Sequence, residues 1–400
     1  MKSIKKILTP ISVIALSLAL ALVGILGIYD CVIPDNLSYF EGDSLPVFMH
    51  AQASSLEFGE GGESSAEYRL LSLVPIKKVE LTALKDKKLI PGGMPFGIKF
   101  FTDGLIVTGF CDVEGENGKV NPAKDAGLKP NDLITHVNGE AASGTESLSN
   151  AIDASQGAEI TLTLLRGENV REMKVTPVKC VTDGKYKTGI LIRDSGAGIG
   201  TVSFIDKESG MFAGLGHGIC NSENGALIPM LRGAVVDVTI SGIEKGQSGI
   251  PGEIKGFFNQ KKLGSLVKNT ECGVFGVLSE IPENPLSKPL PIGLKTDLKE
   301  GEAIIYCTLD DGVMSSYSVL VSDIDTSADG GKCFTVKVTD PRLIEKTGGI
   351  VQGMSGSPII QNGKLVGAVT HVMINDPTRG YGIFIENMLA ASQMRTPRAA

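Results

Sequence analysis

The sequence predicts a mostly β protein of two or three domains that follows one N-terminal membrane-spanning helix. Its 400 residues are 42% hydrophobic, enough apolar material for well-buried cores. It has 50 glycines and no tryptophan, and Gly, Asn and Asp repeatedly break its runs of Val, Ile and Thr. This pattern is typical of short strands joined by tight turns.

The N-terminal helix is predicted from an uncharged run between Ile7 and Ile28. At ~1.5 Å per residue such a helix spans about 30 Å of hydrocarbon. Lys2, Lys5 and Lys6 precede the run, which predicts that the N-terminus stays inside and the body lies outside the cytoplasm. We therefore expect a single-pass membrane protein attached through this helix, with cleavage as a signal peptide as the alternative.

The stretch from Gln52 to Glu67 is rich in Ser, Glu and Gly and has few large apolar residues. It predicts a flexible linker that is accessible to proteolytic nicking.

Composition also limits the ligands. The formal net charge is -7 and no long block of Lys and Arg occurs, which argues against a nucleic-acid surface and favours a protein or peptide partner. The cysteines lack any C-x-x-C spacing, so we expect no metal site, and at most one or two disulfides whose pairing stays open. They are Cys31, Cys111, Cys180, Cys220, Cys272, Cys307 and Cys333.

The segment after Pro91 resembles a PDZ domain. A short helix, a glycine that ends it and an Asn-Gly turn between strands make physical sense of the signature. Asn131 departs from it, because the family usually has glycine there. The residues that match are Ala123, Ala126, Gly127, Leu128, Asp132, Ile134, Asn138 and Gly139.

Such domains bind a peptide as an added strand. The resemblance places the peptide-binding edge at Pro95, Phe96, Gly97 and Ile98, with the helix predicted over residues 145–155 as the other wall. The alternative is a vestigial groove that only holds this domain against the rest of the chain.

A candidate nucleophile lies in the stretch TGGIVQGMSGSP, where glycines flank Ser355. A sharp glycine turn projects a hydroxyl outward while neighbouring N–H groups converge on one point. The same composition also makes ordinary hairpin turns. The rest of the chain has to distinguish the two.

Four histidines are present, and two of them, His50 and His136, are expected to be structural or surface residues. His217 lies between Gly216 and Gly218 on the second strand of a predicted hairpin, where small neighbours leave an imidazole accessible. His371 competes with it, but its apolar run is more typical of a core or rim histidine.

A carboxylate that orients a histidine is the third group of a Ser-His-Asp triad. Asp340 ends a strand-like run fifteen positions before Ser355 and immediately precedes proline. The alternative is a turn start, since Asp-Pro after a strand commonly begins a turn. Asp310, Asp311 and Asp376 are further candidates for the orienting role.

His217, Asp340 and Ser355 with their flanking motifs, LGHGI, TDPRLIEKTGGIVQGMSGSPI and INDPTRGYGIF, resemble the sporulation stage IV B serine peptidase family of spore-forming Gram-positive bacteria. The resemblance covers nearly the whole chain. It implies residues 1–29 as cytoplasmic tip and transmembrane anchor, 30–88 as extracytoplasmic linker and self-cleavage region, 89–180 as PDZ domain and 181–400 as peptidase domain.

For the peptidase domain the resemblance implies a trypsin-like double β-barrel. The short separation of Asp340 from Ser355 fits such enzymes poorly, because their aspartate lies in the first barrel. In the implied mechanism Ser355 is the nucleophile, His217 the base and Asp340 its orienting group. The N–H groups of Gly353 and Ser355 form the oxyanion hole, and no metal or other cofactor is needed.

The implied biology is regulatory. Such enzymes are exported from the forespore into the space between its two membranes, release themselves by self-cleavage, and then cut a membrane-bound inhibitory partner of an intramembrane metalloprotease. The freed metalloprotease processes pro-sigma-K. Two alternatives remain open, a PDZ adaptor without catalytic activity and a protease that degrades damaged envelope proteins.

Overall fold

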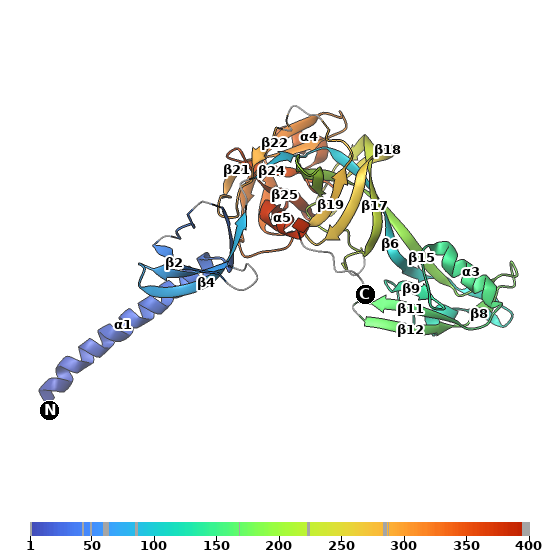
Figure 1. Ribbon diagram of the computed structural model, residues 1–400, viewed down its shortest axis with the longest axis horizontal. Coiled ribbons are helices and arrows are strands. Elements are labelled where there is room, and N and C mark those ends of the chain that lie inside the picture. Colours follow the sequence, from blue (N-terminus) through green and yellow to red (C-terminus); the bar gives the residue numbers. More distant parts are fainter. Residues whose placement is uncertain are drawn as a thin grey trace.

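A computed structural model of the chain describes residues 2–41, 44–48, 50–58, 64–84, 87–167, 169–221, 225–282, 286 and 288–393. The chain forms a projecting N-terminal helix, a small sheet at its foot, a large β body and a PDZ unit on the opposite side of that body (Figure 1). The described chain is mostly β, as the sequence predicts.

Helix α1 (Lys2–Val32) differs from the transmembrane anchor that the sequence predicts. Over the described part of the chain, no helix combines the length and the apolar character needed to cross a membrane. The C-terminal end of α1 is committed to protein contacts instead, because Tyr29 and the following Ile33 are buried in the core of the small sheet. This overturns the predicted anchor and the predicted single-pass membrane location.

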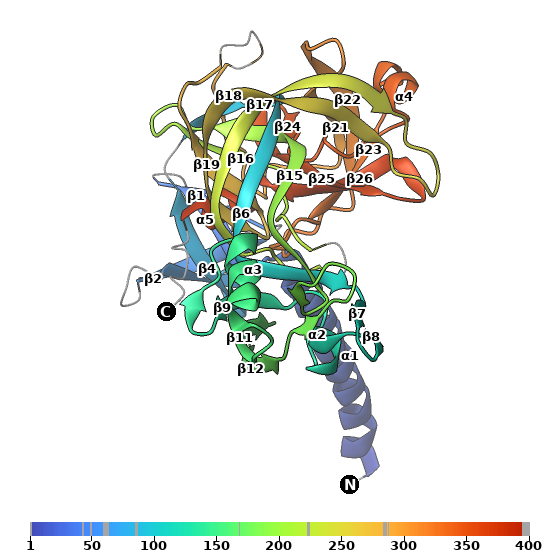
Figure 2. The same cartoon turned by 90° about the vertical axis from the view of Figure 1, so that its right-hand side faces the viewer.

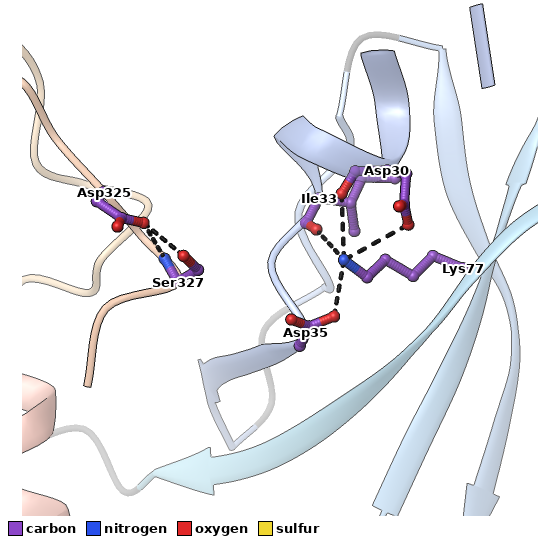
Figure 3. Close-up of polar contacts among 6 residues, drawn as sticks. All are labelled: Asp30, Ile33, Asp35, Lys77, Asp325 and Ser327. Carbon is purple, nitrogen blue, oxygen red and sulfur yellow. Dashed lines mark hydrogen bonds and ion pairs between the residues drawn. The ribbon is translucent and has the colours of Figure 1, made fainter. Parts of the chain in front are cut away.

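The foot of α1 is fastened by one lysine (Figure 3). Lys77 Nζ donates to the carbonyl oxygens of Asp30 at 3.1 Å and Ile33 at 3.0 Å. It also pairs with the Asp35 carboxylate at 2.8 Å. The ammonium group therefore satisfies the last carbonyls of the helix, which lack partners within the helix itself.

The small sheet has the strand order β1-β4-β3-β2. Strands β2 and β3 occupy the stretch predicted as a flexible linker, and that prediction is wrong outside residues 59–63, which are not described. Alternate side chains of β3, Ala66 and Tyr68, are fully buried. This period-two pattern supports a strand even among Ser and Glu. The bounds are β1 (Asn36–Phe40), β2 (Ala51–Phe58), β3 (Ser64–Leu70) and β4 (Val74–Leu84).

Two long antiparallel strands connect the PDZ unit to the body. Strands β6 (Pro95–Phe110) and β15 (Ile190–Ile205) pair from Ile190 opposite Phe110 to Thr201 opposite Pro95. One end of the pair lies in the PDZ unit and the other in the body (Figure 2). Both units therefore share one hydrogen-bonded ribbon rather than a loose linker.

The PDZ unit packs two short helices against a sheet. Its core buries Leu105, Ile134 and Leu162 without residual exposure. Asn131 takes a positive φ of 72°, a conformation that asparagine tolerates better than most residues with a side chain, which accounts for its place where the family has glycine. The elements are β7 (Val113–Gly115), β8 (Gly118–Val120), α2 (Pro122–Asp125), β9 (Leu133–Val137), β10 (Glu140–Ala141), α3 (Thr145–Ser155), β11 (Ile160–Arg166), β12 (Asn169–Val175), β13 (Val178–Lys179) and β14 (Tyr186–Lys187).

The body contains two closed barrels. The C-terminal barrel has the order β21-β22-β23-β26-β25-β24. The other belongs to the 12-stranded sheet that continues into the PDZ unit: β6, β17, β18, β19, β16 and β15 pair in this order, and β15 pairs with β6 again, which closes the ring. Both barrels that the resemblance implies are therefore present. The bounds of the strands not yet given are β5 (Lys88–Pro91), β16 (Met211–Gly214), β17 (Met230–Glu244), β18 (Glu253–Thr270), β19 (Gly273–Leu278) and β20 (Leu290–Pro291).

The strands of the C-terminal barrel surround the largest apolar cluster, which includes Ile305, Phe334 and Val369. Helix α4 lies between β23 and β24 in the chain, and α5 follows the last strand. The bounds are β21 (Gly301–Thr308), β22 (Met314–Ser322), β23 (Phe334–Val338), α4 (Pro341–Thr347), β24 (Pro358–Gln361), β25 (Lys364–Met373), β26 (Asp376–Phe384) and α5 (Ile385–Gln393).

Candidate active site

Ser355 lies on a tight turn between α4 and β24. Gly353 and Gly356 on either side of it have φ of +100° and +99°, a region that favours glycine. A Cβ on Gly356 would lie 1.9 Å from the carbonyl oxygen of Thr201, so no side chain fits there. The glycines that flank the serine are therefore required by backbone conformation and by close packing.

Thr201 on β15 holds this turn through two hydrogen bonds. Its N–H donates to the carbonyl oxygen of Ser355 at 2.9 Å, and its Oγ1 donates to the carbonyl oxygen of Gly353 at 2.7 Å. Within the described chain, the N–H groups of Gly353 and Ser355 donate no hydrogen bond. They remain available for an oxyanion, the role that the resemblance assigns to them.

His217 follows β16 and lines the same cavity as Ser355. The two preceding residues, Leu215 and Gly216, have φ of 67° and +68°, so the chain turns sharply before the histidine. A positive φ is costly for leucine, and such strain is found preferentially at functional sites. A Cβ on Gly216 would lie 2.9 Å from Thr370 Cγ2, so glycine lets this segment approach β25 closely.

The main chain fixes the tautomer of His217. Its Nδ1 lies 2.9 Å from the carbonyl oxygen of Gly218, which only accepts hydrogen bonds, so Nδ1 carries the proton and Nε2 keeps a lone pair. Burial lowers the pKa of His217, and the Gly218 carbonyl partly offsets the shift. The imidazole is therefore neutral and able to accept a proton through Nε2 at neutral pH.

Ser355, His217 and His371 line one cavity of about 490 Å³. The hydroxyl of Ser355 donates to the carbonyl oxygen of Thr370 at 2.6 Å, so its proton is held by the main chain in this arrangement. The other described residues of the wall are mostly apolar, including Ile98 and Phe100. The structure thus brings the predicted nucleophile and the predicted base to one site.

His371, which the sequence offered as a competitor of His217 and which we expected to be a core or rim residue, also lies at this site. On β25 it faces His217, with ring centroids 4.7 Å apart and ring planes inclined by 34°. Its pKa is lowered to about 4 by burial first, and then by the charges of His217 and Lys332. The sequence signal for this placement was the position of His371 on a strand that follows the Ser355 turn; this strand is β25, which forms a hairpin with β24.

Asp340 does not join this site in the structure. Its carboxylate accepts from the N–H of Arg342 at 3.0 Å, capping α4, and it pairs with the Arg342 guanidinium at 2.8 Å. These contacts, hydrogen bonds from Arg342 first, lower the pKa of Asp340 to about 2. Asp340 therefore starts α4, as in the turn-start alternative. It does not line the cavity that holds His217.

The other candidate carboxylates also have different partners. Asp310 and Asp311 pair with Lys346, and Asp376 accepts from the hydroxyl of Thr378 at 2.6 Å. Among the described residues, none of the three lines the cavity around Ser355. The carboxylate of a Ser-His-Asp triad therefore has no counterpart in this wall.

The predicted peptide-binding edge, Pro95 to Ile98, is not an open edge. Strand β15 pairs with all four residues, and β17 pairs with Gly97 and Ile98 on the other side. Phe96 and Ile98 are buried in the body. No peptide can add to this edge, because the first residues of β6 lie inside the sheet of the body, between β15 and β17, and only its later residues reach the PDZ unit.

Another strand edge in the PDZ unit fits a groove better. The first residues of β15 pair with β6 only, and α3 lies beside them, with the N–H of Thr145 donating to the Asp194 carboxylate at 3.2 Å. A cavity of about 790 Å³ at one end of this edge is lined by residues of α3 and by the segment from Lys185 to Ile190.

A nucleophilic serine on a glycine turn, a neutral histidine in the same cavity and an attached PDZ unit define the class as a PDZ-containing serine peptidase. Residues 184–389 match the family described as SpoIVB peptidase S55, and residues 121–166 match a PDZ domain. Because the first match spans more than half of the chain, the chain belongs to the SpoIVB peptidase S55 family.

Individual relatives are more distant. A putative zinc metalloprotease of Lactococcus lactis is 34% identical over 103 residues, 26% of this chain and 22% of the relative, so the chain spans about a fifth of that protein. The PDZ domain of an SdrC-like protein from Listeria monocytogenes is 22% identical, with a TM-score of 0.19, covering 22% of this chain and 87% of that one.

The chain is also similar to the Rv3671c protease in its inactive form, with 13% identity and a TM-score of 0.29, and the match covers 48% of this chain and 81% of that one. A Ser343Ala mutant of the same protein from M. tuberculosis gives 13% identity and a TM-score of 0.27, covering 50% and 85%.

Proposed function

We infer that this chain is a regulatory serine endopeptidase of sporulation that first cleaves itself and then one protein partner. The observation that carries the proposal is that Ser355 and His217 line one cavity, and that the N–H groups of Gly353 and Ser355 donate no hydrogen bond within the described chain. Membership of the SpoIVB peptidase family supports the biological role.

The mechanism follows from the two side chains. Ser355 Oγ attacks the carbonyl carbon of the scissile peptide while its proton moves to Nε2 of His217. The N–H groups of Gly353 and Ser355 hold the oxyanion, and His217 returns the proton to the leaving amine. Water then hydrolyses the acyl-enzyme by the same steps. Before the attack, the hydroxyl of Ser355 has to leave its bond to Thr370.

The proposed partner is the membrane-bound inhibitory protein of an intramembrane metalloprotease, and its cleavage permits processing of pro-sigma-K. The PDZ unit contributes by recognising an extended peptide, from the partner or from this chain, beside β15 and α3. Its support is the open strand edge with an adjoining cavity of about 790 Å³.

Labelling with a fluorophosphonate, which reacts with activated serines, tests the proposal directly. We expect wild type to be labelled, and Ser355→Ala and His217→Ala not to be labelled. If none of the three proteins is labelled, and each is shown to be folded by its thermal transition, the result would favour the adaptor without activity.

The substrate range separates the regulatory peptidase from a degradative one. Broad digestion of unfolded casein would favour envelope quality control, whereas confined cleavage supports regulation. We expect the new N-terminus after self-cleavage to lie between residues 52 and 67, where the described residues of β2 and β3 have to unpair before they can enter a protease cleft as an extended chain. N-terminal sequencing that places it inside the PDZ unit would reject this part of the proposal.

A further inference from the structure

The unexpected contact between His217 and His371 raises the question of what supports the charge of His217 during catalysis. When His217 takes the proton of Ser355 it becomes an imidazolium, which an aspartate stabilises in the Ser-His-Asp arrangement. Among the described residues of this cavity no carboxylate is present, whereas His371 lies directly against the His217 ring.

His371 is held firmly at this place. The neighbouring hydroxyl of Thr370 donates to the carbonyl oxygen of Gly331 at 2.5 Å. Gly331 lies next to both histidines, since a Cβ there would lie 3.5 Å from His371 Cε1 and 3.8 Å from His217 Cβ. The loop at Gly331 is therefore tied to β25 beside His371 and lies against the two histidines.

One nitrogen of His371 has no use in the resting structure. Its Nδ1 is buried and has no hydrogen-bond partner within the described chain. A buried polar atom without a partner is unfavourable, and in a native structure it needs an explanation such as a catalytic role. A neutral imidazole always has one nitrogen that accepts a hydrogen bond.

We propose that His371 is the positioning residue of His217, accepting a hydrogen bond from its imidazolium in a Ser355–His217–His371 relay. The inference rests on the proposed peptidase function. In the resting structure Nδ1–H of His217 donates to Gly218, and in the working arrangement it turns to His371. Burial, and then the titratable His217 and the ammonium group of Lys332 that face it, lower the pKa of His371 to about 4, so its lone pair is available at neutral pH.

Two substitutions separate hydrogen bonding from packing. His371→Phe keeps a buried ring but has no acceptor, whereas His371→Asn keeps an oxygen acceptor near the position of Nδ1 with less ring packing. The measurement is the second-order rate constant of fluorophosphonate labelling of the full chain between pH 4 and pH 9, with thermal unfolding as the check of folding.

We expect His371→Phe to label about 10²-fold more slowly, the usual size of a general-base contribution. The midpoint of its acid limb should also move to lower pH, because the imidazolium has lost its acceptor. His371→Asn should stay within about tenfold of wild type and keep the wild-type midpoint. A purely structural role would not shift the midpoint in the Phe variant.

If His371→Phe is labelled at the wild-type rate while the labelling of His371→Asn is lost, the proposed relay is overturned and the peptidase function stays intact. The same holds if the folded Phe variant labels slowly with an unchanged midpoint. Absence of labelling in folded wild type would instead reject the peptidase function itself, and the relay with it.

Discussion

The carboxylate of Asp340 is bound by the guanidinium of Arg342, two residues further along the chain, with Nη2 2.8 Å from Oδ2 and Nε 3.0 Å from Oδ1. A carboxylate engaged in this way, which also caps a helix, has a structural role. The relationship separates two interpretations of Asp340, as orienting group of His217 or as the start of α4.

Asp340→Asn distinguishes these interpretations. Asparagine caps helices as well as aspartate does, so we expect the labelling rate to stay within about threefold of wild type. Asp340→Ala removes the cap and should cost about 1–2 kcal/mol in the free energy of unfolding. A fall of about 10⁴ in the labelling rate of Asp340→Asn would restore the triad interpretation.

The hydroxyl of Thr201 holds the turn that carries the proposed oxyanion donors, Gly353 and Ser355. Thr201→Val keeps the shape but removes the bond to the Gly353 carbonyl, so we expect about tenfold slower labelling, equivalent to one ordinary hydrogen bond. Thr201→Ser restores the hydroxyl and is the matched control, expected near the wild-type rate. Equal rates for Val and Ser would show that the hydroxyl is dispensable.

Gly356 combines a positive φ with a close approach. Gly356→Ala places a methyl group 1.9 Å from the Thr201 carbonyl oxygen, so we expect loss of labelling and a strongly lowered unfolding temperature. Gly363→Ala is the control, since Gly363 has φ of +75° and open space around it. The free energy of unfolding of this variant should fall by only about 1–2 kcal/mol, the cost of placing a residue with a side chain in the left-handed conformation. Similar stabilities of the two variants would contradict the clash.

The acid limb of activity should follow His217. Because burial lowers its pKa, the imidazole stays neutral further into the acidic range than a free histidine with its pKa of about 6.5. The labelling rate of wild type should therefore rise through a midpoint below about 6.5 and be constant through pH 7. A midpoint above that value would show that a nearby negative charge raises the pKa of His217.

The sequence determined much of this protein by local rules. Glycines on both sides of Ser355 already indicated a turn that exposes its side chain, and those beside His217 indicated an accessible imidazole, although β16 ends at Gly214 and His217 lies beyond the strand on which it was predicted. The structure confirms that both residues lie at one cavity. The Asn-Gly turn of the PDZ unit is confirmed as well, with positive φ at Asn138 and Gly139. Such features depend only on short-range backbone sterics, which is why they can be predicted from a single chain.

Only the tertiary structure decided which residues meet. It placed His371 against His217 and left Asp340 as the cap of α4, a choice that depends on barrel closure and on the close approach that Gly216 permits. It also put Ile98 in the catalytic wall rather than in a peptide groove, because β6 runs through both units. Contacts between segments distant in sequence are set by packing of the whole chain, and no local pattern encodes them.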